Sequence, residues 1–304
     1  PGLLEVNSPL LEEQAQYRTL DSADLAEAMT RKAISAAGAT LVVSDSVVPY
    51  VRGFRNSESQ IHVIPNGVDC SRFMPQDTKS NAQNNDTTTI GFVGTLKPWH
   101  GVSDLIEAFG NVFQQLTPAR LLVVGDGPQR GALEAQVSRL PNLCRQSVEF
   151  LGSVHPDEVP RLLADIDIAV APYEPIKDFY FSPLKLFEYM AAGLPIVSTN
   201  VGQIQEVIEH AATGLLYPPG DTHALAARRV QLVNDSALRI RLGCEARKLA
   251  LSRHTWSSVV DRVLHIASGY RKQFTSEQRP HFLNTSIESG QQATKPIYGS
   301  SENT

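Results

Sequence analysis

The sequence is poor in the features that mark several common classes of protein. Its 304 residues contain only three cysteines, Cys70, Cys144 and Cys244, and no two of them have the spacing of a metal site. Reduced, structural thiols in a cytosolic setting fit this pattern best. No apolar run approaches the roughly 18 residues of a membrane-spanning helix. We therefore expect no transmembrane segment, while peripheral contact with a membrane stays open.

A surplus of positive charge is also missing. Lysine and arginine total 27 against 32 aspartates and glutamates, which gives a formal net charge of -5. This balance argues against a nucleic-acid-binding protein, which needs a broad basic surface. A small anionic ligand remains an option if the positive charges that bind it are clustered at one place on the protein. The chain begins with Pro1 rather than methionine, so we expect a fragment or a processed chain.

From residue 89 onward, short apolar runs alternate with helical patterns. This alternation predicts an α/β fold with a doubly wound, parallel, Rossmann-like sheet. The runs are continuously apolar, which indicates strands buried on both faces. We expect strands at 89–94, 120–126, 148–152, 167–172, 195–199 and 214–217, and helices near 103–115, 128–139, 157–164, 183–192, 204–210, 221–233 and 236–251.

The first part of the chain has the pattern of the end of another α/β unit. A helix is expected over 21–37, and short apolar runs follow at 41–44 and 61–64. Turn residues and a polar stretch then predict a domain boundary. The expected organisation is a remnant of an N-terminal Rossmann-like domain (1–64), a linker (65–88), a ligand-binding domain (89–255), a helix with an apolar stripe that starts at Trp256 (256–274), and a disordered tail (275–304).

In an open α/β sheet, ligands bind beyond the carboxyl ends of the strands. The first loop at such a position, residues 93–102, carries Gly94, Lys97 and His100. Backbone amides at the glycine turn and the start of the next helix favour an anion, and Lys97 or His100 could neutralise a phosphate. The alternative is a turn in which Trp99 packs as a lid and both cations are solvated.

Two further loops carry weaker signals. Residues 125–131 have the spacing G-x-G-x-x-x-G, one residue longer than a dinucleotide fingerprint. A tight turn into a helix, with Pro128 at the first helical position, is the favoured interpretation. The loop from Gly152, which contains Val154, could meet a nucleobase through its backbone, although an ordinary loop is favoured. Asn66, in the turn PNGVD, could orient a ligand between the domains or simply form the turn.

The fourth loop leads into a helix with two isolated charges. Ser182 is expected to cap this helix and Pro183 to occupy its first turn. The helix is otherwise apolar all round, so it should be buried. Lys185 in the first turn opposes the helix dipole, which makes sense if an anion binds there. Glu188 needs hydrogen-bond donors, which sugar hydroxyls would provide; alternatively, Lys185 and Glu188 pair with each other.

The motifs occur in an order that resembles retaining glycosyltransferases of family 4. The series runs PNGVD, VGTLKPWHG, VVGDGP, FLGSV, DIAVAP, SPLKLFEYMAAGLPIVST, VGQIQEV and TGLLYPPGD, and covers about residues 39–270. The resemblance implies a GT-B fold, in which two Rossmann-like domains face each other across a cleft. It also implies a nucleotide diphosphate sugar as donor, transfer without a metal or cofactor, and retention of configuration, as in a hexosyltransferase.

The resemblance assigns roles to several residues. Glu188 matches the glutamate that binds the donor ribose, while Lys185 and the backbone amides near Leu184 would meet the diphosphate. Where the family has an arginine and a lysine after the first strand of this domain, this chain has Thr95 and His100.

Two further family positions depart from the pattern. A second family glutamate falls on Tyr180. The family histidine near the reacting sugar would precede Pro1, so no catalytic residue is assigned, and this chain alone is expected to bind donor but to transfer sugar very slowly.

Three functions compete. The chain is either a glycosyltransferase that lacks its start or a nucleotide-sugar-binding module without transfer of its own. A nicotinamide-dependent oxidoreductase is a weaker third, suggested only by the G-x-G-x-x-x-G turn. The nucleobase, the sugar and the acceptor stay open.

Overall fold

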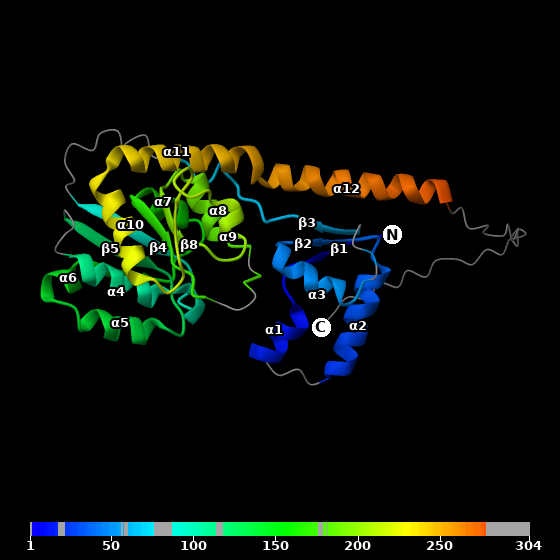
Figure 1. Cartoon of the computed structure of the whole chain (residues 1–304), viewed down its shortest axis with the longest axis horizontal. Helices are drawn as coiled ribbons and strands as arrows, with labels where there is room; N and C mark the ends of the chain where they lie inside the picture. The colour runs from blue at the N-terminus through cyan, green and yellow to red at the C-terminus, as the bar shows by residue number, and fades with distance from the viewer. Residues whose placement is uncertain are drawn as a thin grey trace, which may run out of the picture.

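The computed structural model describes residues 2–17, 22–55, 57, 60–75, 87–113, 118–175, 179–180 and 182–277. These residues form two α/β units, joined by the segment after β3 and by the long helix α12 (Figure 1). All of the paired strands are parallel, as predicted.

The smaller unit is a three-stranded sheet of order β1-β2-β3. Helices α2 and α3 cover one face of this sheet and α12 covers the other (Figure 1). Val259 of α12 is buried against Leu41 and Ile64, with Val263 and Ile266 beside them. The elements are β1 Leu3–Val6, α1 Leu10–Tyr17, α2 Ala23–Ala36, β2 Ala39–Val42, α3 Val48–Arg52, β3 Ile61–Val63 and α12 Trp256–Glu277.

The larger unit is a six-stranded sheet of order β6-β5-β4-β7-β8-β9. All six strands expected from the sequence are present. Five of them are largely buried, whereas the edge strand β6 alternates between half-buried and exposed residues. Since β4 lies between β5 and β7, the direction of winding reverses there, and the helices that follow β4 and β7 pack on opposite faces of the sheet. The strands are β4 Thr88–Val93, β5 Ala119–Val124, β6 Val148–Gly152, β7 Ile168–Ala171, β8 Ile196–Thr199 and β9 Leu215–Tyr217.

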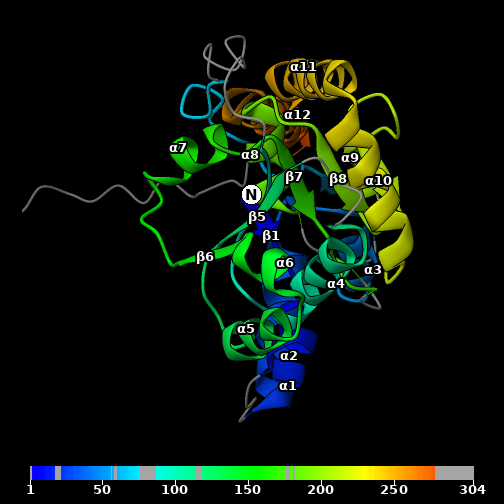
Figure 2. The same ribbon diagram turned by 90° about the vertical axis from the view of Figure 1, so that its left-hand side faces the viewer.

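Helices cover both faces of this sheet (Figure 2). One core lies under α8 and α11, and the other under α4, α5 and α10. The helices are α4 Val102–Val112, α5 Arg130–Ser138, α6 Asn142–Gln146, α7 Val159–Ala164, α8 Leu184–Ala191, α9 Ile204–Val207, α10 Thr222–Asn234 and α11 Ser236–Arg253. Pro128 lies in the turn before α5 rather than at its first helical position, because Gln129 is the N-cap.

The segment expected as a linker is packed over its first part. Val68, Cys70 and Phe73 are buried in the core under α8. The chain passes between the two units twice, before Val68 and again near Thr255, and these crossings are paired: the Val68 amide donates to the His254 carbonyl at 2.7 Å. Residues 76–86 and 278–304, which include most of the expected tail, lie outside the described residues.

The apolar stripe of α12 divides into two parts. One flank packs on the smaller sheet, whereas Trp256, Val260 and Leu264 are 46%, 51% and 60% exposed. The sequence predicted this stripe from its helical spacing. Within the described residues, no helix is long and apolar enough to cross a membrane.

Arg229 of α10 is a buried cation that no carboxylate balances. It is fully buried, and its three guanidinium nitrogens lack hydrogen-bond partners. Burial lowers the pKa of Arg229 to about 9. The guanidinium lies 5.7 Å from the ring centre of Phe109, which offsets only part of the desolvation cost.

We therefore expect Arg229→Met to raise the free energy of unfolding by about 1–3 kcal/mol, because it replaces an unpaired buried charge with an apolar side chain of similar length. Denaturation by urea measures the change. Arg228→Met, one position earlier and half-buried, is the matched control and should have little effect. A loss of stability in Arg229→Met alone would reveal a partner of the guanidinium.

Candidate functional site

The loops after β4 and β7 meet at the point where the winding reverses. Gly101 makes this contact possible: its φ is 60°, and a Cβ there would lie 1.7 Å from the Pro172 carbonyl oxygen. The Glu174 amide also donates to the Trp99 carbonyl at 3.1 Å. The two loops therefore form one wall, which places the start of α8 beside the end of β4.

The glycines at the ends of β4, β5 and β6 allow three backbones to approach closely. The Gly94 amide donates to the Val124 carbonyl at 2.9 Å, and the Gly125 amide to the Gly152 carbonyl at 2.8 Å. A Cβ on Gly125 would lie 2.0 Å from the Gly94 oxygen. The G-x-G-x-x-x-G turn thus has a packing role, which is the interpretation that the sequence favoured.

Ser182 does not cap α8. The N-cap is Pro183, and no side chain bonds to the first turn. The Ser182 hydroxyl instead accepts a hydrogen bond from the Asn66 amide at 3.1 Å, and the Asn66 side-chain amide donates to the Ser182 carbonyl at 3.4 Å. The sequence identified both residues, and the structure brings them together where the two units meet.

The two units make further direct contacts beside this point. The Ser44 hydroxyl donates to the Tyr180 carbonyl at 2.8 Å, and the Gln203 side chain donates to the Val43 carbonyl at 2.7 Å. The carboxyl end of β2 therefore faces the loop that leads into α8.

Lys185 holds its amine inside the protein. The Nζ atom is buried and has no hydrogen-bond partner among the described residues. It lies 4.2 Å from the ring centre of Phe92 and 5.2 Å from that of Tyr173. A Cβ on Gly94 would be 2.6 Å from this nitrogen, so the glycine leaves the room that the amine occupies. Burial lowers the pKa of Lys185 to about 7, although Glu188 opposes the shift.

Glu188 is half-buried one turn further along α8. Burial raises the pKa of its carboxyl group, while Lys185 and Arg72 act in the opposite direction. Because the Lys185 amine makes no hydrogen bond, the lysine–glutamate pair considered as an alternative does not form. Lys185 and Glu188 therefore do not pair with each other.

His100 does not supply the positive charge expected of it. Its Nδ1 atom is hydrogen-bonded to the Thr95 carbonyl. Burial, followed by the charge of Lys185, lowers the pKa of His100 to about 4. The ring is therefore neutral at neutral pH. Lys97 places its amine 5.6 Å from the ring centre of Trp99, while the Thr95 side chain is exposed.

The loop after β6 forms the other side of the site. Val154 is half-buried against the core. Arg72 ties this loop to the segment after the first crossing, with a hydrogen bond of 2.9 Å to the Asp157 carboxylate and one of 3.3 Å to the Pro156 carbonyl. Sequence reasoning missed Arg72, Phe92 and Tyr173; only the position of Tyr173, directly after a strand, gave a signal.

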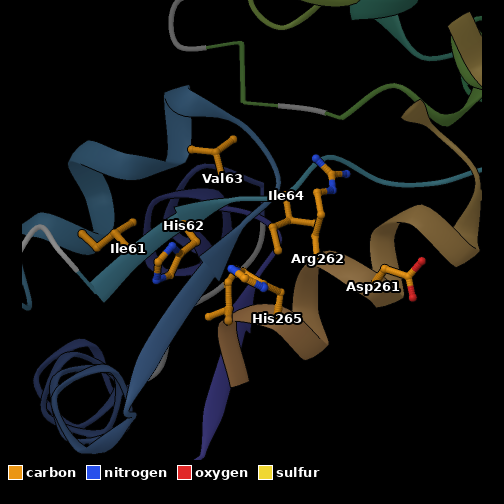
Figure 3. A pocket seen from close by; sticks show the side chains of 8 residues that line it. Ile61, His62, Val63, Ile64, Asp261, Arg262 and His265 are labelled. Carbon is orange, nitrogen blue, oxygen red and sulfur yellow. The ribbon is translucent and has the colours of Figure 1, made fainter. Parts of the chain in front are cut away.

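A separate hollow of about 570 Å³ lies between β3 and α12 (Figure 3). Neither Lys185 nor Glu188 lines it. The His62 ring, whose pKa burial lowers, is 3.2 Å from the Tyr270 hydroxyl. The lining residues are Ile61, His62, Val63, Ile64, Asp261, Arg262, His265 and Ile266. Within the described part of the chain, no group of three or more histidines, cysteines or acidic residues could hold a metal ion.

Comparison with known sequences identifies the larger unit. Residues 87–235 match the family described as Glycosyl transferases group 1. The chain is 29% identical over 238 residues to N-acetyl-alpha-D-glucosaminyl L-malate synthase of Bacillus anthracis, covering 77% of this chain and 60% of that protein. It is 25% identical over 258 residues to the sulfoquinovosyl transferase SQD2 of Arabidopsis thaliana, covering 82% and 48%. The chain thus spans about half to three fifths of the length of these relatives.

Solved structures support the fold. A crystal structure of Anabaena HepE in complex with UDP and glucose superposes with a TM-score of 0.71 at 21% identity, covering 88% of this chain and 72% of that one. Sucrose-phosphate synthase from Thermosynechococcus elongatus gives 0.68 at 22%, covering 90% and 74%. Residues 87–235 are thus similar to the glycosyl transferases group 1 family, and the fold of the chain is the Rossmann-like fold of GT-B glycosyltransferases.

Proposed function

We propose that this chain is the donor-binding part of a retaining glycosyltransferase of family 4 that uses a nucleotide diphosphate sugar. The observation that carries the proposal is the pair on α8, an unpartnered lysine amine and an unpaired glutamate one turn apart at the carboxyl edge of the sheet. Two relatives with sequence similarity are named N-acetyl-alpha-D-glucosaminyl L-malate synthase and sulfoquinovosyl transferase. Solved complexes of a protein with this fold contain UDP and UDP-glucose.

The donor would lie across the start of α8. The Glu188 carboxylate accepts hydrogen bonds from the ribose hydroxyls, and the diphosphate lies at the first turn, where free amides near Leu184 and the helix dipole favour negative charge. Lys185 supplies the cation. The loop with Val154, held by Arg72, borders the nucleobase.

The reaction follows from what these groups stabilise. The oxygen of an acceptor hydroxyl forms a bond to the anomeric carbon on the face from which the nucleotide leaves, and the bond from that carbon to the diphosphate oxygen breaks. The hydroxyl proton passes to the departing diphosphate. The task of the described site is to stabilise the negative charge that grows on that diphosphate. The acceptor hydroxyl would come from the side of the smaller unit.

A nucleotide-sugar panel tests the proposal. UDP-, GDP-, ADP-, dTDP- and CMP-sugars are added to the purified chain and thermal unfolding is followed. At 100 times its dissociation constant, the correct donor should add about 2.7 kcal/mol of stability. Stabilisation by none of them would overturn the proposal. Radiolabelled sugar then separates a transferase from a module that only binds the donor, since only the former gives a glycosylated product.

Donor binding is expected to be independent of divalent metal. In the described residues, Glu188 is not part of a group of three or more acidic, histidine or cysteine side chains that would attract Mg²⁺ or Mn²⁺. Titration of the donor before and after treatment with excess EDTA should give the same affinity within twofold. A loss of tenfold or more that added Mg²⁺ restores would contradict this expectation.

A further inference from the structure

The amine of Lys185 occupies a position that disfavours its charged form. Its nitrogen is buried, has no hydrogen-bond partner, and faces the rings of Phe92 and Tyr173. An ammonium ion that loses its water shell is strongly destabilised, and two ring faces offset only part of that loss. The position suits a neutral amine better than a cation.

Apart from Glu188, none of the described groups around this amine supplies a compensating negative charge. Tyr173, on the loop after β7, is buried, which raises the pKa of its phenol and keeps it neutral. The Tyr189 hydroxyl of α8 accepts from the Val93 amide at 2.9 Å and is likewise kept protonated by burial. On the loop after β4, His100 is neutral and Lys97 is a second cation.

Glu188 is the nearest acidic group, and its effect on Lys185 is weaker than the effect of burial. Arg72 also draws on the same carboxylate. Glu188 is the only acidic group among those that shift the pKa of Lys185, and its charge is shared with Arg72.

We propose that Lys185 is a stored cation: in the empty site its neutral amine lies inward against Phe92 and Tyr173, and it turns outward and takes up one proton when the diphosphate of the donor arrives. This inference rests on the proposed function, since the diphosphate is the group that calls for the charge. The proton comes from solvent, and the product is an ammonium ion hydrogen-bonded to phosphate oxygens.

The position of Gly94 supports the inward state. A Cβ at this residue would lie 2.6 Å from the Lys185 nitrogen and 3.1 Å from the adjacent methylene carbon. Any side chain at position 94 would displace the Lys185 amine from its inward position. The glycine thus permits the stored position as well as the close approach of the strand ends.

The pKa of about 7 fixes the size of the effect. At pH 8 the neutral amine outnumbers the ammonium form about ten to one, so binding should take up about 0.9 proton per site, against about 0.1 at pH 6. Above pH 7 the affinity should fall about tenfold for each pH unit, until the pH reaches the pKa of the bound state.

The first measurement uses the empty protein. NMR follows the carbon next to the amine in every lysine as the pH rises, and Lys185→Arg identifies the Lys185 signal by removing it. One lysine should titrate near pH 7. Lys248 pairs with Glu245 on the surface at 2.7 Å. This pairing raises the pKa of Lys248, so Lys248 is the internal reference and should stay charged while Lys185 titrates. If every lysine titrates above pH 9, the inference is overturned.

The second measurement uses calorimetry with UDP-glucose, or with the donor from the panel that binds most tightly. Titration in buffers of different ionisation enthalpy counts the protons taken up; a nucleotide sugar is suitable because its diphosphate does not titrate near neutral pH. Wild type should take up about 0.9 proton at pH 8. Lys185→Arg, whose guanidinium stays charged, should take up none.

The outcomes separate the two proposals. Donor binding without proton uptake at pH 8 would overturn the stored cation and leave the proposed function standing. A lysine that titrates near pH 7 in a protein that binds no nucleotide sugar would establish the buried amine and overturn the proposed function. Lys185→Met, which cannot be charged, should lose at least tenfold in affinity at pH 6.

Discussion

Gly125→Ala is expected to lower the free energy of unfolding by about 2–6 kcal/mol. The residue has a φ of +129°, a conformation that costs an L-residue about 1–3 kcal/mol. The added Cβ would also lie 2.0 Å from the Gly94 oxygen and 2.8 Å from its carbonyl carbon, and such overlap costs roughly another 1–3 kcal/mol. Because both contacts are backbone atoms, no side chain can move away to relieve them.

Urea denaturation measures this loss, and Gly131→Ala is the matched control. Gly131 lies in the same G-x-G-x-x-x-G turn and helix start, yet nothing lies within 4 Å of the position of its Cβ. Since it is inside α5, alanine there should stabilise by about 0.5–1 kcal/mol. Opposite signs for two glycines six residues apart would establish that the first is a packing glycine. Equal effects would contradict the close approach of the strand ends.

Glu188→Gln is expected to weaken binding of the nucleotide sugar by about 10–150-fold. The change keeps the shape of the side chain but removes the charge that accepts the ribose hydroxyls, and a hydrogen bond to a charged group contributes about 1.5–3 kcal/mol. Calorimetry on the donor and on its 2′,3′-dideoxyribose analogue shows whether the lost affinity comes from the contact with the ribose hydroxyls. Wild type should lose affinity for the analogue, whereas the variant should bind both ligands equally.

Glu245→Gln is the control for this experiment. Glu245 lies on α11, where its side chain is 45% exposed and pairs only with Lys248 among the described residues, so its loss should change donor affinity by less than twofold. If Glu188→Gln folds normally and binds the donor as wild type does, the carboxylate does not hold the ribose. The ribose would then have to lie elsewhere along the edge of the sheet.

Most strands of the larger sheet could be predicted because burial on both faces favours apolar residues, and the edge strand β6 could be predicted because it is mostly apolar although Glu149 is exposed. The short β1 was not predicted. It has only four residues and its Glu5 is exposed, so no continuous apolar run marks it in the sequence. Helix boundaries shifted where local geometry overrode the pattern; the helix expected from 183 begins at Leu184 because Pro183 is its N-cap.

The site was only partly predictable. Lys185 and Glu188 could be identified because charges are conspicuous in an apolar helix. The surroundings of the Lys185 amine could not, because Phe92 and Tyr173 come near it only through the pairing of β4 with β7. The neutrality of His100 likewise follows from burial, which no local pattern reveals.

The two paired crossings limit how the units can move. Val68 is hydrogen-bonded to His254, and Gly67 lies so close to Trp256 that a Cβ would be 3.0 Å from its backbone. A single flexible crossing would leave three rotational degrees of freedom, whereas two crossings fixed side by side remove most of the torsional freedom between the units. We expect the units to open and close by bending about one axis through this pair, so that the carboxyl end of β2 approaches the start of α8 along the same path in every cycle.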